Sequence, residues 1–142
     1  MIQNPNFNFS SRRSATLGFN GTVATSNPLA ANAGLDILKK GGHAVDAAVC
    51  AASVLNVVEP MSTGVGGDVF ALVYDSKSKS VEALNGSGKS SIRTDINKLE
   101  EIGLDSIPLD GLYSGMAVSV PGCVDAWAVS YTHLTLPTIY SV

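Results

Sequence analysis

The longest apolar segment of the chain, residues 44–58, contains only three polar side chains, those of Asp46, Ser53 and Asn56. Their spacing places them on one narrow side of a helix, because residues three, four and seven apart share a helical face. No helix-breaking residue occurs before Pro60, and the segment is shorter than the roughly 20 apolar residues that a membrane span requires. The pattern predicts a core helix whose alanines allow close approach to other backbone.

A second, amphipathic helix is predicted immediately before this one. Apolar residues recur every four positions between residues 29 and 37. The tripeptide Ser26-Asn27-Pro28 supplies a capping residue followed by proline at the first helical position, and Gly41 and Gly42 end the helix. The two predicted helices therefore abut at the glycine pair.

Beyond residue 60 the pattern changes to a glycine-rich loop and then to strands. Gly64, Gly66 and Gly67 either adopt backbone angles closed to other residues or let a helix and a sheet pack closely. The apolar runs 69–74 and 81–84 flank the polar segment DSKSKS. This arrangement predicts an antiparallel hairpin.

Helices and strands together give an α/β (α+β) fold class over residues 22–128, preceded by a polar arm at residues 1–21. Apart from the helix pair and the hairpin, four shorter elements are expected. They are a strand at 22–25, a helix at 95–102 capped by Thr94, a strand at 117–120 closed by a Pro-Gly turn, and a helix from Val124.

The final segment, from about Val129, departs from the helical pattern immediately after Ala128. Its sequence, VSYTHLTLPT, matches the in-frame translation of a transposon-type library adapter. We therefore expect residues 129–142 to be adapter read-through and not native protein, so that Tyr131, His133 and Tyr140 carry no function. The alternative is a genuine exposed edge strand.

Charge and cysteine content narrow the classes of partner. The chain has 9 basic and 12 acidic residues and a net charge of −3, which gives no basic surface for nucleic acid and no polybasic membrane patch. Cys50 and Cys123 form neither a disulfide framework nor a metal-binding spacing, so we expect no metal and no cofactor. The amino end contains no signal-peptide-like apolar run, which favours a cytoplasmic location if Met1 is the true start.

Candidate chemistry is sparse. Residues 83–90, ALNGSGKS, fit a loose phosphate-loop pattern, but a true phosphate loop needs a long helix starting at Lys89, and none is predicted there. Ser87 and Ser90 have no base at a recognisable spacing. His43 is interpreted as structural, and Asp46 as a helix cap or a buried hydrogen-bonding group. Nucleotide binding through NGSGKS stays as an alternative function.

The ordered motifs resemble the large-subunit half of the γ-glutamyltranspeptidase family over about residues 21–127. They are GG-x-A-V-D-A-A, the loop E-P-x-S-x-G-x-G-G, the hairpin and SVPGCVDAW, which recur in one order with plausible spacing. Family members are N-terminal nucleophile hydrolases whose precursor cuts itself into a large and a small subunit. The resemblance implies that residues 22–128 are an incomplete fragment of a four-layer αββα sandwich.

The resemblance also implies a reaction. The family nucleophile is a threonine freed at the start of the small subunit, which attacks an amide to form an acyl-enzyme. We expect that threonine to lie downstream, so that this chain alone contains no catalytic residue, is inactive and folds poorly. The remaining alternative is a non-catalytic binding protein of the same fold.

The expected substrate-binding residues are Asn85, Gly86 and Ser87. The large subunit of the family usually contributes an arginine that pairs with the substrate carboxylate, and its position here corresponds to Gly86. Loss of the guanidinium removes a charge-assisted contact. LNGSG together with SVPGCVDAW looks like the subgroup that includes cephalosporin acylases, which cleave glutaryl-type amides. The expected partners are a small-molecule γ-glutamyl or glutaryl amide and the small subunit of the same precursor.

Overall fold

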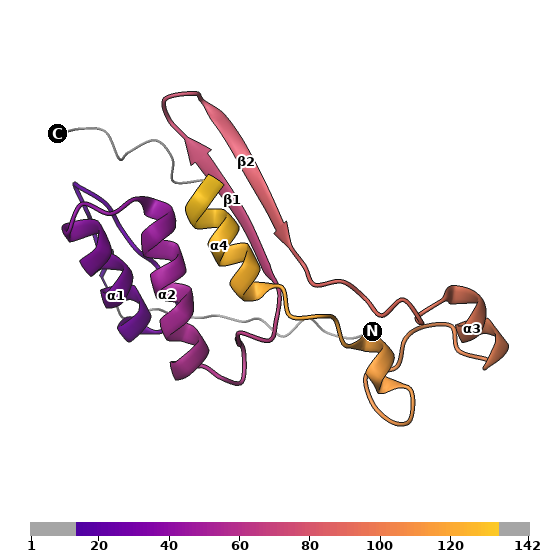
Figure 1. Cartoon of the computed structure of the whole chain (residues 1–142). Coiled ribbons are helices and arrows are strands. Elements are labelled where there is room, and N and C mark those ends of the chain that lie inside the picture. The colour runs from indigo at the N-terminus through magenta and orange to yellow at the C-terminus, as the bar shows by residue number, and fades with distance from the viewer. Residues whose placement is uncertain (1–13, 134–142) are drawn as a thin grey trace, which may run out of the picture.

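The computed structural model describes residues 14–133 of the chain. A helix pair lies on one side, α4 lies between α2 and a two-stranded antiparallel hairpin, and the short helices extend away from the rest (Figure 1). This mixture of helices and antiparallel strands agrees with the predicted fold class. In chain order the elements are α1 (Pro28–Lys39), α2 (Ala44–Val58), β1 (Val69–Asp75), β2 (Ser80–Gly86), α3 (Ile96–Glu101), a 3₁₀ helix (Ser114–Ala117) and α4 (Cys123–His133).

Both ends of α1 follow the sequence signals. The Asn27 side chain caps the helix by accepting a hydrogen bond from the Leu29 amide at 2.9 Å, and proline occupies the first helical position. At the other end Gly41 has a φ of 88°, a left-handed conformation that glycine adopts without steric cost. The amides of Gly41 and Gly42 donate to carbonyls of the last turn, which closes the helix.

α2 begins with a reciprocal cap made by His43 and Asp46. The His43 Nδ1 accepts from the Val45 amide at 3.3 Å, and the Asp46 Oδ2 accepts from the His43 amide at 2.9 Å. These bonds confirm the interpretation of Asp46 as a cap. They also give His43 a structural role, as expected for a single histidine.

The two helices pack through small residues. Ala30 and Gly34 of α1 are buried, as are Ala47 and Ala51 of α2. A methyl group at Gly34 would lie 3.0 Å from the Ala47 carbonyl oxygen, so the backbones are as close as glycine and alanine allow. The predicted close approach is confirmed, although only Val45, Ala47 and Ala51 of α2 are buried and the predicted core helix also has exposed residues.

The hairpin has two unlike faces. In its register Val69 pairs with Gly86 and Asp75 with Ser80. Side chains alternate between the faces of a strand, and those of Val69, Ala71 and Val73 are half-buried on the α4 side. The opposite face carries exposed apolar side chains, which are Phe70, Leu72 and Tyr74 with 70%, 78% and 64% of their surface exposed.

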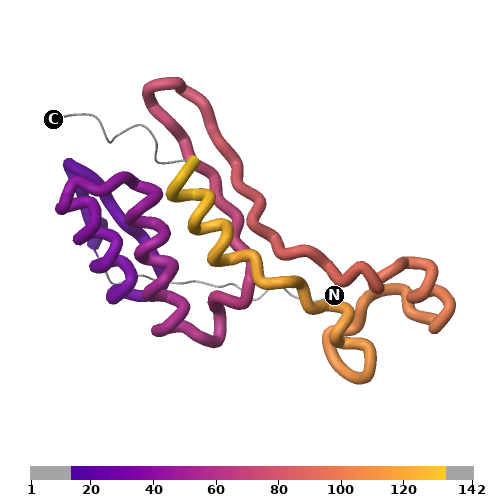
Figure 2. Tube along the Cα trace, viewed as in Figure 1, coloured from indigo at the N-terminus to yellow at the C-terminus, as the bar shows by residue number. Residues whose placement is uncertain are grey.

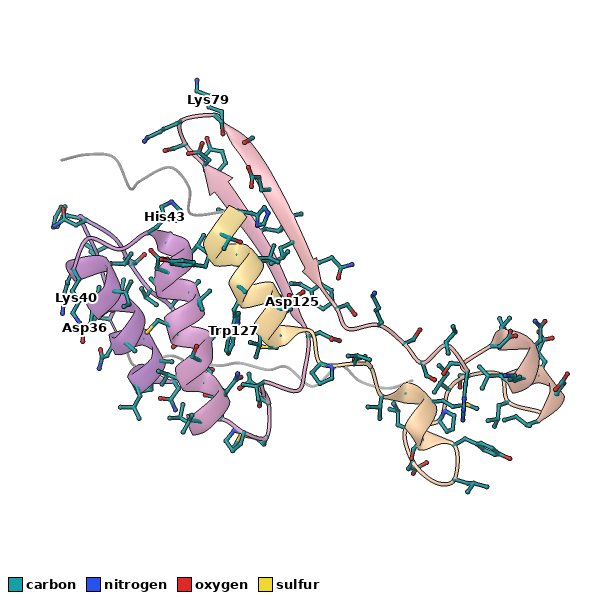
Figure 3. All side chains as sticks on the ribbon, viewed as in Figure 1. Asp36, Lys40, His43, Lys79, Asp125 and Trp127 are labelled. Carbon is teal, nitrogen blue, oxygen red and sulfur yellow. The ribbon has the colours of Figure 1, made fainter. Side chains whose placement is uncertain are left out.

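α4 joins the hairpin to the helix pair. Cys123 and Ala126 are buried, with 3% and 2% of their surface exposed. The Trp127 side chain projects from α4 into the space between α4 and α2 (Figure 3). α4 therefore contributes small side chains toward the hairpin and a large one toward α2.

Two predicted strands do not form among the described residues. Residues 22–25 have no ladder partner, and residues 118–120 follow the 3₁₀ helix with one backbone bond to a distant segment, from the Val120 amide to the Lys89 carbonyl. A strand is stable only when its backbone groups are paired with a neighbour, and local propensity does not supply that neighbour.

The start of α3 also differs from the prediction. Asp95, and not Thr94, caps the helix by accepting from the Asn97 amide at 3.0 Å. The Thr94 hydroxyl is buried without a hydrogen-bond partner. Aspartate is a somewhat stronger capping residue than threonine, which agrees with the observed cap.

The predicted end of the last helix at Ala128 is wrong, because α4 continues to His133. The hydroxyls of Ser130 and Thr132 donate to carbonyls four residues earlier, at 2.8 and 2.9 Å, so these polar residues are satisfied within the helix. Helix formation does not test the origin of residues 129–142, and read-through stays a prediction. Tyr140 lies outside the described residues.

Candidate functional site

Three separate segments meet at the open end of the hairpin (Figure 2). They are residues 64–68, which lead into β1, residues 86–89, which leave β2, and residues 119–123, which lead into α4. We call this meeting point the glycine junction because each segment contributes at least one glycine. It contains the predicted substrate-binding residues Gly86 and Ser87.

Backbone hydrogen bonds tie the three segments together. The amides of Gly122 and Cys123 both donate to the Gly67 carbonyl, at 3.2 and 3.0 Å, and the Val120 amide donates to the Lys89 carbonyl at 2.9 Å. The first pair satisfies amides at the start of α4, which lack partners inside the helix. The junction is therefore built mainly from backbone.

One acidic side chain completes these links. The Oδ1 atom of Asp68 accepts a hydrogen bond from the Gly88 amide at 2.7 Å and a longer one from the Ser119 hydroxyl at 3.5 Å. Asp68 thus contacts both of the other segments. An ionised acceptor strengthens such a bond relative to a neutral one.

The glycines of the junction provide room for this close approach. A Cβ atom at Gly86 would overlap the Ala126 side chain and lie 2.9 Å from the Val69 carbonyl oxygen. A Cβ at Gly88 would overlap the Val120 carbonyl oxygen, and one at Gly122 would lie 2.9 Å from the Gly88 nitrogen. None of these three glycines has a positive φ. Close packing, and not an unusual backbone angle, requires glycine here.

The loop glycines before β1 behave differently from either expectation. Gly64 and Gly66 have no atom near the position of a Cβ, and neither they nor Gly67 has a positive φ. The predicted special backbone angles are therefore absent at these three positions. A Cβ at Gly67 would lie 3.3 Å from the Gly64 carbonyl oxygen of the same loop, so the predicted packing of a helix against a sheet is not found at these glycines either.

The structure divides the three predicted substrate-binding residues between two faces of the hairpin. Asn85 pairs with Phe70 on the exposed face, whereas Gly86 faces Ala126 of α4. Ser87 is exposed, and its amide donates to the Asn85 Oδ1 at 3.0 Å. Asn85 and Ser87 are thus brought together. Gly86 has no space for a side chain and offers only backbone groups.

The geometry of a phosphate loop is absent from residues 83–101. Lys89 does not begin a helix, and the next helix, α3, starts only at Ile96. The Gly88 amide, which a phosphate oxygen would need, already donates to Asp68. The observation agrees with the prediction that no helical run starts at Lys89.

Other possible sites carry little chemistry. A cavity of about 380 Å³ lies between α2, β1 and α4 and is lined mostly by apolar side chains. Two of its polar members have structural partners, since His43 caps α2 and the Ser130 hydroxyl donates to Ala126. The Trp127 Nε1, by contrast, is buried without a hydrogen-bond partner. Within residues 14–133 no cluster of three metal-ligating side chains occurs, and none of the helices is long and apolar enough to span a membrane.

Asp68 and Ser119 were not predicted from the sequence as parts of the site. A usable signal for Asp68 was its place between a glycine run and an apolar strand, where a polar residue is unusual. Ser119 offered no such signal, because its contact joins residues that are 51 positions apart in the chain.

Comparison with known proteins shows which family this chain is similar to. The family model described as Gamma-glutamyltranspeptidase matches residues 30–135. A glutathione hydrolase-like proenzyme of Bacillus subtilis (YwrD) is 43% identical over 80% of this chain and 21% of its own length. A glutathione hydrolase proenzyme of the same species is 37% identical over 87% of this chain and 22% of its own length.

A solved structure gives the same result for the fold. The crystal structure of cephalosporin acylase from Bacillus halodurans superimposes with a TM-score of 0.73 and 41% sequence identity, covering 94% of this chain and 24% of that chain. The chain therefore spans between a fifth and a quarter of the length of these relatives. Its mixed helix-and-sheet fold is that of the family, and the chain belongs to the γ-glutamyltranspeptidase family.

Proposed function

We propose that the protein to which these 142 residues belong is an amide hydrolase or acyl transferase acting on γ-glutamyl or glutaryl amides. The observation that carries the proposal is the family match over residues 30–135. Relatives named glutathione hydrolase and cephalosporin acylase support the amide class. Because the chain covers 21% and 22% of the two Bacillus subtilis relatives, the activity is proposed for the full-length protein, the product of the complete reading frame.

The proposed reaction uses a threonine at the start of a small subunit, downstream of the native residues of this chain. Its hydroxyl oxygen attacks the amide carbonyl while the α-amino group of the same residue accepts the proton. The amine leaves with a proton, and the acyl-enzyme ester is then cleaved by water or by a second amine. The competent enzyme in this proposal contains the small subunit as its partner, needs no metal or cofactor, and is cytoplasmic.

Asn85, Gly86 and Ser87 are proposed to contact the acyl part of the substrate. Asn85 and Ser87 supply an amide and a hydroxyl on the exposed side of the glycine junction. Gly86 supplies backbone only, since a side chain there would overlap Ala126. Without a guanidinium at this position, a bidentate contact to an α-carboxylate is missing. We therefore favour a glutaryl amide over a γ-glutamyl amide as the better substrate.

The test is hydrolysis of matched chromogenic amides by the purified full-length protein. We expect release of p-nitroaniline from both glutaryl and γ-glutamyl p-nitroanilide, with the larger kcat/KM for the glutaryl compound.

The competing function, nucleotide binding through NGSGKS, predicts saturable micromolar ATP binding that the Lys89→Ala variant abolishes. If neither amide is cleaved and ATP binds in this way, nucleotide binding replaces amide hydrolysis as the proposed function. Absence of both would leave a non-catalytic binding protein of the same fold.

A further inference from the structure

We propose that Asp68 is a positioning residue that fixes the substrate-binding segment Asn85–Ser87 through the Gly88 amide. This inference rests on the proposed function, since it concerns how that segment is held for the substrate. Asp68 precedes β1 by one residue and lies 20 positions before Gly88 in the chain. Its carboxylate therefore connects the beginning of one strand to the segment that leaves the other.

The segment needs such a support because its regular pairing stops at Gly86. The ladder of the hairpin ends with the Val69–Gly86 pair, and residues 87–91 belong to no helix or strand. Two bonds hold the segment to the other parts of the junction. The Gly88 amide donates to Asp68 at 2.7 Å, and the Lys89 carbonyl accepts from Val120 at 2.9 Å.

The two bonds differ in what they constrain. The Lys89 bond lies beyond the substrate-binding residues, whereas the Gly88 amide follows Ser87 directly and is part of the same peptide unit as the Ser87 carbonyl. Fixing this peptide unit fixes the direction in which the chain leaves Ser87. The Ser87 amide is then presented to the Asn85 side chain at 3.0 Å. Asp68 thereby acts on both polar members of the proposed site.

The Gly88 amide is held between two neighbours, the Asp68 carboxylate and the Val120 carbonyl. A Cβ at Gly88 would overlap the Val120 carbonyl oxygen, so the segment is pressed against residue 120 on one side and bonded to Asp68 on the other. If the acceptor is lost, the Gly88 amide must turn toward water, and the close approach to Val120 changes with it. The Ser119 hydroxyl, at 3.5 Å from the same carboxylate oxygen, is too far away to hold Asp68 strongly.

The test compares Asp68→Asn, Asp68→Ala and Asp68→Glu in the full-length protein with glutaryl p-nitroanilide. We expect Asp68→Ala to raise KM about tenfold with kcat within about threefold of the wild type, since the interaction positions the bound substrate and does not take part in bond breaking. Asp68→Asn keeps a neutral acceptor and should show a smaller rise, and Asp68→Glu should recover part of the loss. Asp75→Asn, at the opposite end of the hairpin, is the matched control and should leave both constants unchanged.

Hydrogen–deuterium exchange of the peptide containing Gly88 provides a readout that does not depend on catalysis. We expect faster exchange in Asp68→Ala and Asp68→Asn and no change in Asp75→Asn. If the exchange rate of this peptide and the KM match the wild type in Asp68→Ala and in Asp68→Asn, the inference is overturned. If the wild type cleaves neither amide, the proposed function fails, and the exchange experiment alone still decides whether Asp68 holds the segment. Should Asp68→Ala fail to fold, the Asn and Glu variants carry the same comparison.

Discussion

At the scale of single residues, the glycines show where sequence reasoning succeeded and where it stopped. Gly41 was predicted to end a helix, and its left-handed φ of 88° confirms this, because the signal is local. Gly86 was placed in a substrate-binding segment, but its contact with Ala126 joins residues 40 positions apart in the chain. The local sequence pattern predicts the backbone conformation at a turn. It does not show which residues far away in the chain leave no room for a side chain.

A double-mutant cycle tests the fit between Gly86 and Ala126. We expect Gly86→Ala in the full-length protein to destabilise it by about 1–3 kcal/mol, because the new methyl group overlaps the Ala126 side chain. Ala126→Gly removes that obstacle, and the double variant should melt at a higher temperature than the sum of the two single effects predicts. Strictly additive melting temperatures would show that the two positions do not touch.

Asp75 gives a pH-dependent prediction at the hairpin turn. A hydrogen bond from the Ser78 hydroxyl, followed by bonds from the Lys77 and Ser78 amides, lowers its pKa from the ordinary value of 3.8. Because the pKa of Asp75 is lower in the folded state than in the unfolded state, its ionised form stabilises the fold at pH values above the unfolded pKa. This stabilisation is lost as the pH falls through the folded pKa. Nuclear magnetic resonance titration of the Ser78 amide, in protein labelled with ¹⁵N-serine, should give a midpoint below 3.8. A midpoint above that value would contradict the observed bonds.

At the scale of elements, the helix pair and the hairpin were predictable and the isolated strands were not. The bounds predicted for α2 agree with the structure because its apolar run, the capping side chains and the following proline all lie within one short segment. Residues 22–25 and 117–120 carried strand-like side chains but no information about a partner. The ladder of β1 and β2 was predictable because the partner follows directly in the chain.

The interface between α1 and α2 yields a prediction at this scale. Gly34→Leu places a large side chain where a Cβ already lies 3.0 Å from the Ala47 carbonyl oxygen, so we expect a loss of about 2 kcal/mol or more. Asn32→Leu introduces the same side chain on the exposed side of α1 and serves as the control. Thermal melting of both full-length variants compares them. Equal melting temperatures would mean that the helices are not in close contact.

At the scale of the whole molecule, the exposed face of the hairpin is the main feature. Phe70, Leu72 and Tyr74 form an apolar row on the side away from α4. Within residues 14–133, every large side chain keeps at least 2% of its surface exposed. Exposed apolar strand faces favour association. The sequence indicated the apolar character of β1, but only the structure shows which of its two faces α4 covers.

We therefore expect the 142-residue chain, expressed alone, to self-associate and to lack hydrolase activity. Sedimentation velocity should show species larger than a monomer, and the triple variant Phe70→Thr, Leu72→Thr and Tyr74→Thr should reduce them. A soluble monomer with sharp cooperative melting would contradict the folding part of this expectation. Turnover of either p-nitroanilide by the purified chain would contradict the other part.

The central claim, that this chain is part of a self-processing amide hydrolase, is tested most directly by the intact mass of the protein expressed from the complete, unfragmented gene. We predict two chains whose masses sum to that of the precursor plus one water, with threonine as the first residue of the second chain, and with native sequence in place of the adapter-like residues 129–142. A single unprocessed chain that ends with VSYTHLTLPTIYSV would contradict both the proposed nucleophile and the proposed function.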